Sequence, residues 1–135
     1  MGYSMQKMDI KGEVYSTTIK VLVDSGSKVT LINSDVAREM EMAGLNPVNL
    51  IGPKNEPLSG FLAFATLRIV GTPYTVRQKV VVINKTVFSL DALAGMDFIT
   101  AAKIGANHQQ FDIKCDKCSA PLDTCDCTWL PFKFG

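Results

Sequence analysis

The sequence has no apolar run approaching the roughly 18 consecutive residues that a membrane-spanning helix needs. Its N-terminal segment also lacks the apolar stretch of a secretory signal peptide. Lysine and arginine never cluster in more than a pair, and the formal net charge is only +1. Because no basic field is available to attract a polyanion, we expect neither direct nucleic-acid binding nor membrane association.

The chain is short but large enough for a real core. A domain of about 135 residues buries roughly two-thirds of the surface of its unfolded chain, so neither a disulfide nor a metal is required for folding. The hydrophobic share of 47% and the charged share of 20% are those of an ordinary globular protein. We predict one domain over residues 9–135, preceded by a linker or expression remnant at residues 1–8.

The pattern of apolar and β-branched residues predicts mainly short strands. A short helix is expected after Asn33, with Gly44 as its stop signal, and a second over residues 96–104. The density of glycine and proline between Ile51 and Gly60 predicts an exposed hairpin tip. The expected strands are residues 9–15, 17–23, 29–32, 61–70, 74–83, 111–113 and 128–134. The fold class is therefore all-β with one or two short helices, arranged as a small closed barrel or a sandwich.

One stretch carries the strongest chemical signal. The apolar residues 21–23 lead directly into Asp24, followed by Ser25 and Gly26, so a buried strand ends at a tight turn and presents a carboxylate there. An Asx-turn or a structural salt bridge explains most Asp-x-Gly triplets. Because Asp24 emerges from the core and not from a polar loop, we take it as the candidate reactive group.

Two motifs in this order resemble the retropepsin family, the single-domain aspartic proteases of retroviruses and long-terminal-repeat retrotransposons, with domesticated host members. The first is Leu22-Val23-Asp24-Ser25-Gly26-Ser27, and the second, about seventy residues later, is Leu93-Ala94-Gly95-Met96-Asp97-Phe98. A short helix and a glycine-containing hairpin separate them. The resemblance covers residues 10–114 and implies a barrel-like domain that works as a symmetric homodimer.

The resemblance implies an aspartic endopeptidase. The chemistry needs two carboxylates, and the chain has one such motif, so the second Asp24 would come from the partner subunit. The two would share a proton and activate a water, without a metal or a covalent intermediate. In the active-site loop, Ser25 would bond across the dimer axis, and Gly26 would let a substrate backbone approach closely; Ser27 completes this loop.

Further roles follow from the same resemblance. Leu22 and Gly95 would support the active-site loop from beneath, where Ala94 is smaller than the usual family residue. Lys28 stands near a position that is acidic in many viral members, so we expect a preference for acidic residues beside the cleavage site. A flap around residues 52–57 would close over an extended peptide. The predicted substrate-binding residues are Lys28, Leu31, Pro53, Lys54, Asn55 and Leu93.

The four cysteines are confined to residues 115–127. Their pairs, one Cys-x-x-Cys and one Cys-x-Cys, have the composition of a four-thiolate structural zinc site. Disulfides within the loop and free thiols stay open as alternatives. Such a zinc would have no open coordination position and would take no part in catalysis. The residues concerned are Cys115, Cys118, Cys125 and Cys127.

The remaining candidates are less specific. His108 has no Ser or Cys partner nearby in sequence and is interpreted as a surface residue, while Trp129, Phe132 and Phe134 are expected in a core or an interface. The predicted partners are a second copy of the chain and an extended peptide or polyprotein substrate, with no cofactor for catalysis. The predicted location is cytoplasmic, including virus-like particles, and a nuclear location stays open. The alternative function is an inactive dimerisation or protein-binding module in a host regulator; a weaker one is a zinc-dependent interaction domain.

Overall fold

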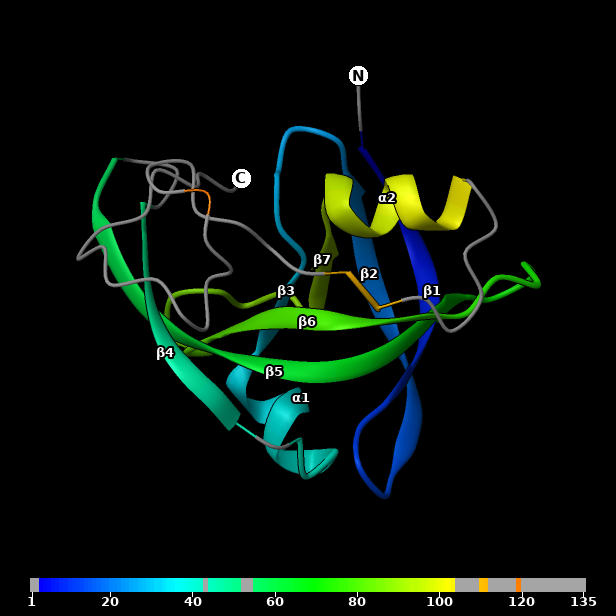
Figure 1. The fold of residues 1–135 in the computed structure, drawn as a ribbon, viewed down its shortest axis with the longest axis horizontal. Helices are drawn as coiled ribbons and strands as arrows, with labels where there is room; N and C mark the ends of the chain where they lie inside the picture. The colour runs from blue at the N-terminus through cyan, green and yellow to red at the C-terminus, as the bar shows by residue number, and fades with distance from the viewer. Residues whose placement is uncertain (1–2, 43, 52–54, 104–109, 112–118, 120–135) are drawn as a thin grey trace.

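The computed structural model describes residues 3–42, 44–51, 55–103, 110–111 and 119. The chain forms eight strands and two short helices within this part (Figure 1). The elements are β1 (Tyr3–Lys11), β2 (Ser16–Asp24), β3 (Leu31–Asn33), α1 (Ser34–Glu39), β4 (Gly44–Ile51), β5 (Pro57–Ile69), β6 (Val76–Ile83), β7 (Ala92–Ala94), α2 (Met96–Lys103) and β8 (Gln110–Phe111).

The strands form one sheet that closes on itself. Its order is β4-β5-β1-β2-β7-β3-β6-β8, and an additional pairing of β5 with β6 joins the two ends of the six middle strands into a barrel. β4 and β8 lie outside this ring, on β5 and β6. The predicted small closed barrel with two short helices is confirmed.

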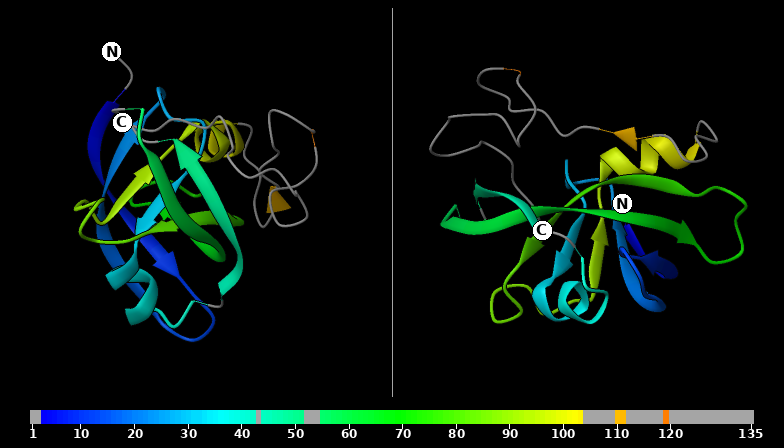
Figure 2. Two further views of the ribbon diagram at one scale, coloured as in Figure 1. Left: turned by 90° about the vertical axis from the view of Figure 1, so that its left-hand side faces the viewer. Right: turned by 60° about the horizontal axis from the view of Figure 1, so that its bottom comes forward.

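The core follows from alternation along the strands. Met8 and Ile10 of β1 and Val21 of β2 are fully buried and pack with α2 residues such as Phe98. A second cluster, which includes Leu31, Leu50, Leu62 and Leu93, lies under the β4–β5 hairpin. The two helices lie at opposite ends of the barrel (Figures 1 and 2).

Three antiparallel hairpins make up much of the barrel. β1 pairs antiparallel with β2, β4 with β5, and β5 with β6. The turn between β5 and β6 contains Gly71, whose φ of 92° explains why glycine stands there. The second helix is also confirmed, as α2, and the expected strand near residue 111 corresponds to the short β8. The expected closing strand at residues 128–134 lies outside the described residues.

The start of the ordered chain was predicted wrongly. Regular structure begins at Tyr3, not after residue 8, because β1 pairs with β2 along its whole length, from Tyr3 opposite Asp24 to Lys11 opposite Ser16. The side chains of residues 4–7 are exposed, so no hydrophobic alternation marks this part of the strand. Backbone hydrogen bonding to a neighbouring strand explains its order.

The first helix begins as expected, but it ends early. Asn33 caps it, accepting a hydrogen bond from Val36 N at 3.0 Å. The helix stops at Glu39, and Glu41 adopts a φ of 49°, the left-handed conformation expected of a C-terminal glycine. Gly44 instead opens β4. The backbone amide of Met42 reaches back to the Ala37 carbonyl at 3.0 Å, which closes the helix without a glycine.

Candidate active site

Asp24 is the last residue of β2 and is only 5% exposed. The backbone amide of Gly26 donates to Asp24 Oδ1 at 2.8 Å, and the Ser27 amide donates to the Asp24 carbonyl at 3.2 Å. A Cβ on Gly26 would lie 3.0 Å from the same Oδ1, so glycine lets the amide approach the carboxylate. The strand end therefore carries an Asx-type turn that fixes the orientation of the carboxyl group.

The rest of the loop separates into buried and exposed residues. Ser25, Gly26 and Lys28 are exposed, so they line the surface beside Asp24. Ser27 is 1% exposed, and its hydroxyl donates to the Val29 carbonyl at 2.7 Å. Ser27 thus holds the loop, whereas Ser25 and Gly26 face solvent beside Asp24.

The junction of β7 and α2 braces this loop from beneath. The Met96 amide donates to the Ser27 carbonyl at 2.8 Å, and the Gly95 amide donates to Thr30 Oγ1 at 3.1 Å. A Cβ on Gly95 would lie 2.3 Å from the Val29 carbonyl oxygen, a distance that real side chains do not show. Only glycine therefore fits at this contact with the loop backbone. Ala94 is fully buried opposite Val23 in the parallel β2–β7 pair.

A buried acid lies deeper in the same structure. Both oxygens of Asp97 accept hydrogen bonds: Thr30 Oγ1 and the Phe98 amide donate to Oδ1 at 2.7 Å each. Gln78 Nε2 donates to Oδ2 at 2.8 Å, and the Thr30 amide does so at 3.3 Å. Burial outweighs these bonds and raises the pKa of Asp97.

Sequence reasoning gave Asp97 no role, although it stands in the second motif. An Asp in the first turn of a helix is common without any further partner, so its position alone was uninformative. The signal that could have found it is its pairing with Thr30, which only the fold brings within reach. Asp97, Thr30 and Gln78 come from α2, the loop before β3, and β6.

Two predicted substrate contacts are wrong for the structure as described. Leu31 is fully buried and Leu93 is 2% exposed, and both belong to the core cluster under the β4–β5 hairpin. A side chain without exposed surface cannot contact a peptide, so these residues stabilise the domain. Leu22 is half-buried and packs against the same cluster, as expected of loop support.

The structure describes only some of the other predicted site residues. Asn55 is exposed beside the β4–β5 turn with a φ of 62°. Pro53 and Lys54 lie outside the described residues, as do the four cysteines, His108 and the three C-terminal aromatic residues. Within the described part, no group of three or more histidine, cysteine, aspartate or glutamate side chains is arranged to hold a metal ion.

The hollows that are best formed on the described surface lie away from Asp24. Five hollows of about 310 to 550 Å³ mark the described surface, and none is lined by Asp24 or by residues 25–30. The candidate site thus carries one buried carboxylate and lies outside these five hollows. A catalytic cleft would need a second surface placed against it.

Comparison with models of known protein families and with curated proteins finds no match for this chain. The fold and the site define the class only as a closed β-barrel with a buried carboxylate on a braced, glycine-containing loop. No helix in the described part is long and apolar enough to cross a membrane.

Proposed function

We propose that the chain is one subunit of a symmetric homodimeric aspartic endopeptidase of the retropepsin type. The observation that carries the proposal is the support beneath Asp24. An ordinary Asx-turn needs only the Gly26 amide, but here Gly95 packs against the loop backbone and the buried Asp97 binds Thr30 at the end of the loop. Such rigid placement of one carboxyl group is what a catalytic acid requires and what a surface turn does not.

The described part of the chain supplies one such carboxylate, so in this proposal a second copy supplies the other. The start of β1, the loop after β2 and the start of α2 lie at one end of the barrel (Figure 1). Large apolar side chains are exposed there: Met5 is 53% exposed and Met96 is 39% exposed. Met5 pairs with Leu22, two residues before Asp24, and Met96 holds the loop through its amide. A two-fold contact at this end would cover both methionines and bring the two carboxyl groups together.

In such a dimer the two Asp24 side chains share one proton, since two like charges at short range cannot both ionise. The ionised carboxylate takes a proton from a water held between them as this water attacks the peptide carbonyl. The protonated partner donates to the carbonyl oxygen. As the tetrahedral intermediate collapses, the first carboxyl group gives the proton it took from water to the leaving amine, and the second recovers a proton from a hydroxyl group of the intermediate. The chemistry needs no metal.

The proposed substrate is an extended segment of a polyprotein or a host protein, held between the active-site loops and the β4–β5 hairpin. Lys28 is exposed and lies four residues after Asp24. Its ammonium group favours acidic residues next to the cleaved bond.

The test compares the wild-type chain with Asp24→Asn. The wild type is expected to sediment as a dimer and to cleave members of a peptide library, whereas Asp24→Asn keeps the dimer and loses cleavage by at least about a hundredfold. Asp35→Asn is the matched control, because Asp35 is a surface acid paired with Lys85 and Arg38 at the far end of the barrel. Peptide cleavage by Asp24→Asn at the rate of the wild-type chain would refute the proposal.

One observation favours a second candidate, a retropepsin-like dimerisation or protein-binding module without activity. The Gly26 amide already engages Asp24 Oδ1, so the turn has a structural use that requires no chemistry. This candidate predicts a dimer in which Asp24→Asn changes stability but no peptide is cleaved at acidic or neutral pH.

A further inference from the structure

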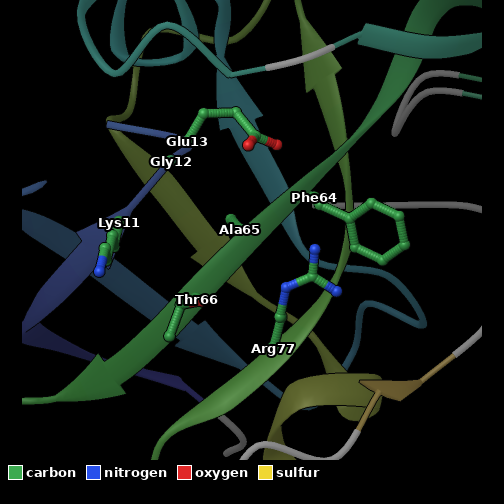
Figure 3. A pocket seen from close by; sticks show the side chains of 7 residues that line it. All are labelled: Lys11, Gly12, Glu13, Phe64, Ala65, Thr66 and Arg77. Carbon is green, nitrogen blue, oxygen red and sulfur yellow. The ribbon is translucent and has the colours of Figure 1, made fainter. Parts of the chain in front are cut away.

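A hollow of about 310 Å³ lies at the opposite end of β2 from Asp24 (Figure 3). Lys11, one of its lining residues, pairs with Ser16 at the first residue of β2, and Asp24 is the last. The nine-residue strand separates the two places by about 25 Å. The hollow is therefore not part of the candidate active site. It is lined by Lys11, Gly12, Glu13, Phe64, Ala65, Thr66 and Arg77.

Three lining residues form one row across neighbouring strands. Lys11 of β1 pairs with Thr66 of β5, and Thr66 pairs in turn with Arg77 of β6. Residues paired in this way project from the same face of a sheet. The row therefore places a hydroxyl group between two cations that stand 66 residues apart in sequence, and the exposed Lys11 and Arg77 are open to solvent.

The guanidinium group of Arg77 is held in place by an aromatic ring. Its Cζ lies 4.4 Å from the centroid of the Phe64 ring, and Lys79 Nζ lies 5.8 Å from the same centroid. Stacking on a ring leaves the edge of a guanidinium group, with its N–H donors, free to bind a planar anion. No ion pair within the described residues joins Lys11 or Arg77 to a carboxylate. By contrast, Arg68 on the next row is bound to Asp9.

The side of the hollow formed by Gly12 and Glu13 is held in place by close packing and a backbone hydrogen bond. Gly12 packs so closely on the segment after α1 that a Cβ there would lie 2.4 Å from the Met40 carbonyl oxygen. The Gly12 amide also donates to the Tyr15 carbonyl at 3.0 Å, which closes the β1–β2 turn. Glu13 follows on this turn, and Figure 3 shows its carboxylate and the Arg77 guanidinium facing the same space.

We propose that this hollow binds an acidic segment of a partner protein, with a carboxylate on Arg77, Thr66 and Lys11 and a neighbouring apolar side chain against Phe64. Charge complementarity and the apolar wall together favour a peptide. A nucleic acid fits less well, because the Glu13 carboxylate in the lining repels a continuous run of phosphates more strongly than a single carboxylate. The proposal does not depend on catalysis.

The experiment uses the full chain carrying Asp24→Asn, so that peptides are not cleaved. Dependence of binding on Arg77, which lines the hollow, separates this binding from peptide binding at the proposed active site. The probe is a fluorescein-labelled, capped hexapeptide of alternating leucine and glutamate, titrated by fluorescence anisotropy. We expect saturable binding that weakens at least about tenfold with Arg77→Gln and is also reduced by Lys11→Gln. Glu13→Gln should strengthen binding, because it removes the opposing charge.

Lys7→Gln is the matched control, since Lys7 is an exposed lysine of the same strand outside the hollow, and binding should stay within about twofold. Circular dichroism checks that each variant is folded. The proposal is overturned if the lysine version of the peptide binds equally well, if Arg77→Gln leaves binding unchanged, or if only inorganic phosphate binds. Tighter, Arg77-dependent binding of oligodeoxythymidine would assign the hollow to nucleic acid instead.

Discussion

Gly95 is the position where the support of the active-site loop can be tested most sharply. In Gly95→Ala the new Cβ would lie 2.3 Å from the Val29 carbonyl oxygen and 2.9 Å from that of Ser27, whereas ordinary contact begins at 3.4 Å. The loop backbone must therefore move by about 1 Å. This movement strains the hydrogen bonds from Met96 to Ser27 and from Gly95 to Thr30.

Overpacking of a tight site costs about 1 to 3 kcal/mol, and each lost hydrogen bond about 1 kcal/mol more. We therefore expect the free energy of unfolding, measured by urea titration, to fall by about 3 to 5 kcal/mol. Peptide cleavage should fall further than the loss of folded protein explains, because the displaced loop carries Asp24.

The matched control is Gly44→Ala, at an exposed glycine where the nearest heavy atom would be Phe61 Cδ2 at 3.4 Å. This change should alter stability by no more than about 0.5 kcal/mol. If Gly95→Ala is as stable as Gly44→Ala, the argument that the β7–α2 junction braces the loop is refuted.

Three further predictions concern the pH dependence, the specificity and the metal content. Because burial raises the pKa of Asp97 above the usual 3.8, its contribution to stability is full below that pH and is lost as the pH rises through the raised pKa. Urea titrations across this pH range should show the free energy of unfolding falling with pH in the wild type and changing less in Asp97→Asn. Identical pH profiles for the two proteins would contradict this prediction. Lys28→Glu should shift the cleavage profile away from acidic residues, and a peptide library that shows no acidic enrichment for the wild type would end that hypothesis. If the four cysteines bind structural zinc, elemental analysis should find about one zinc per chain. Chelation should remove this zinc while Asp24-dependent cleavage persists. If the purified protein contains no metal, the four cysteines form disulfides or are free thiols.

Much of the fold was predictable because its strands alternate or are strongly β-branched. The β5–β6 pair has buried residues at Leu67, Ala65 and Ala63 and a glycine turn, so pattern and turn chemistry agree. The start of β1 was not predictable from such a pattern, since its exposed residues are ordered by the β2 backbone. Glu41 likewise takes a left-handed conformation without the glycine that normally signals it.

The candidate site likewise contains residues that could be predicted from the sequence and residues that could not. Asp24 and Gly95 were predictable because their requirements are local: a strand end and a position without room for a side chain. The resemblance implied substrate contacts for Leu31 and Leu93, yet the fold buries both. The bond between Thr30 and Asp97 and the row of Lys11, Thr66 and Arg77 depend on strand order, which the linear sequence does not display.

The central claim is that two Asp24 carboxyl groups, one from each copy, act as one catalytic unit. Wild-type chain refolded together with Asp24→Asn at varied ratios tests it directly, with cleavage measured against the wild-type fraction at constant total protein. The account predicts that activity follows the square of the wild-type fraction, so that an equal mixture keeps about a quarter of it. A linear dependence would show that each chain acts alone and would contradict the account.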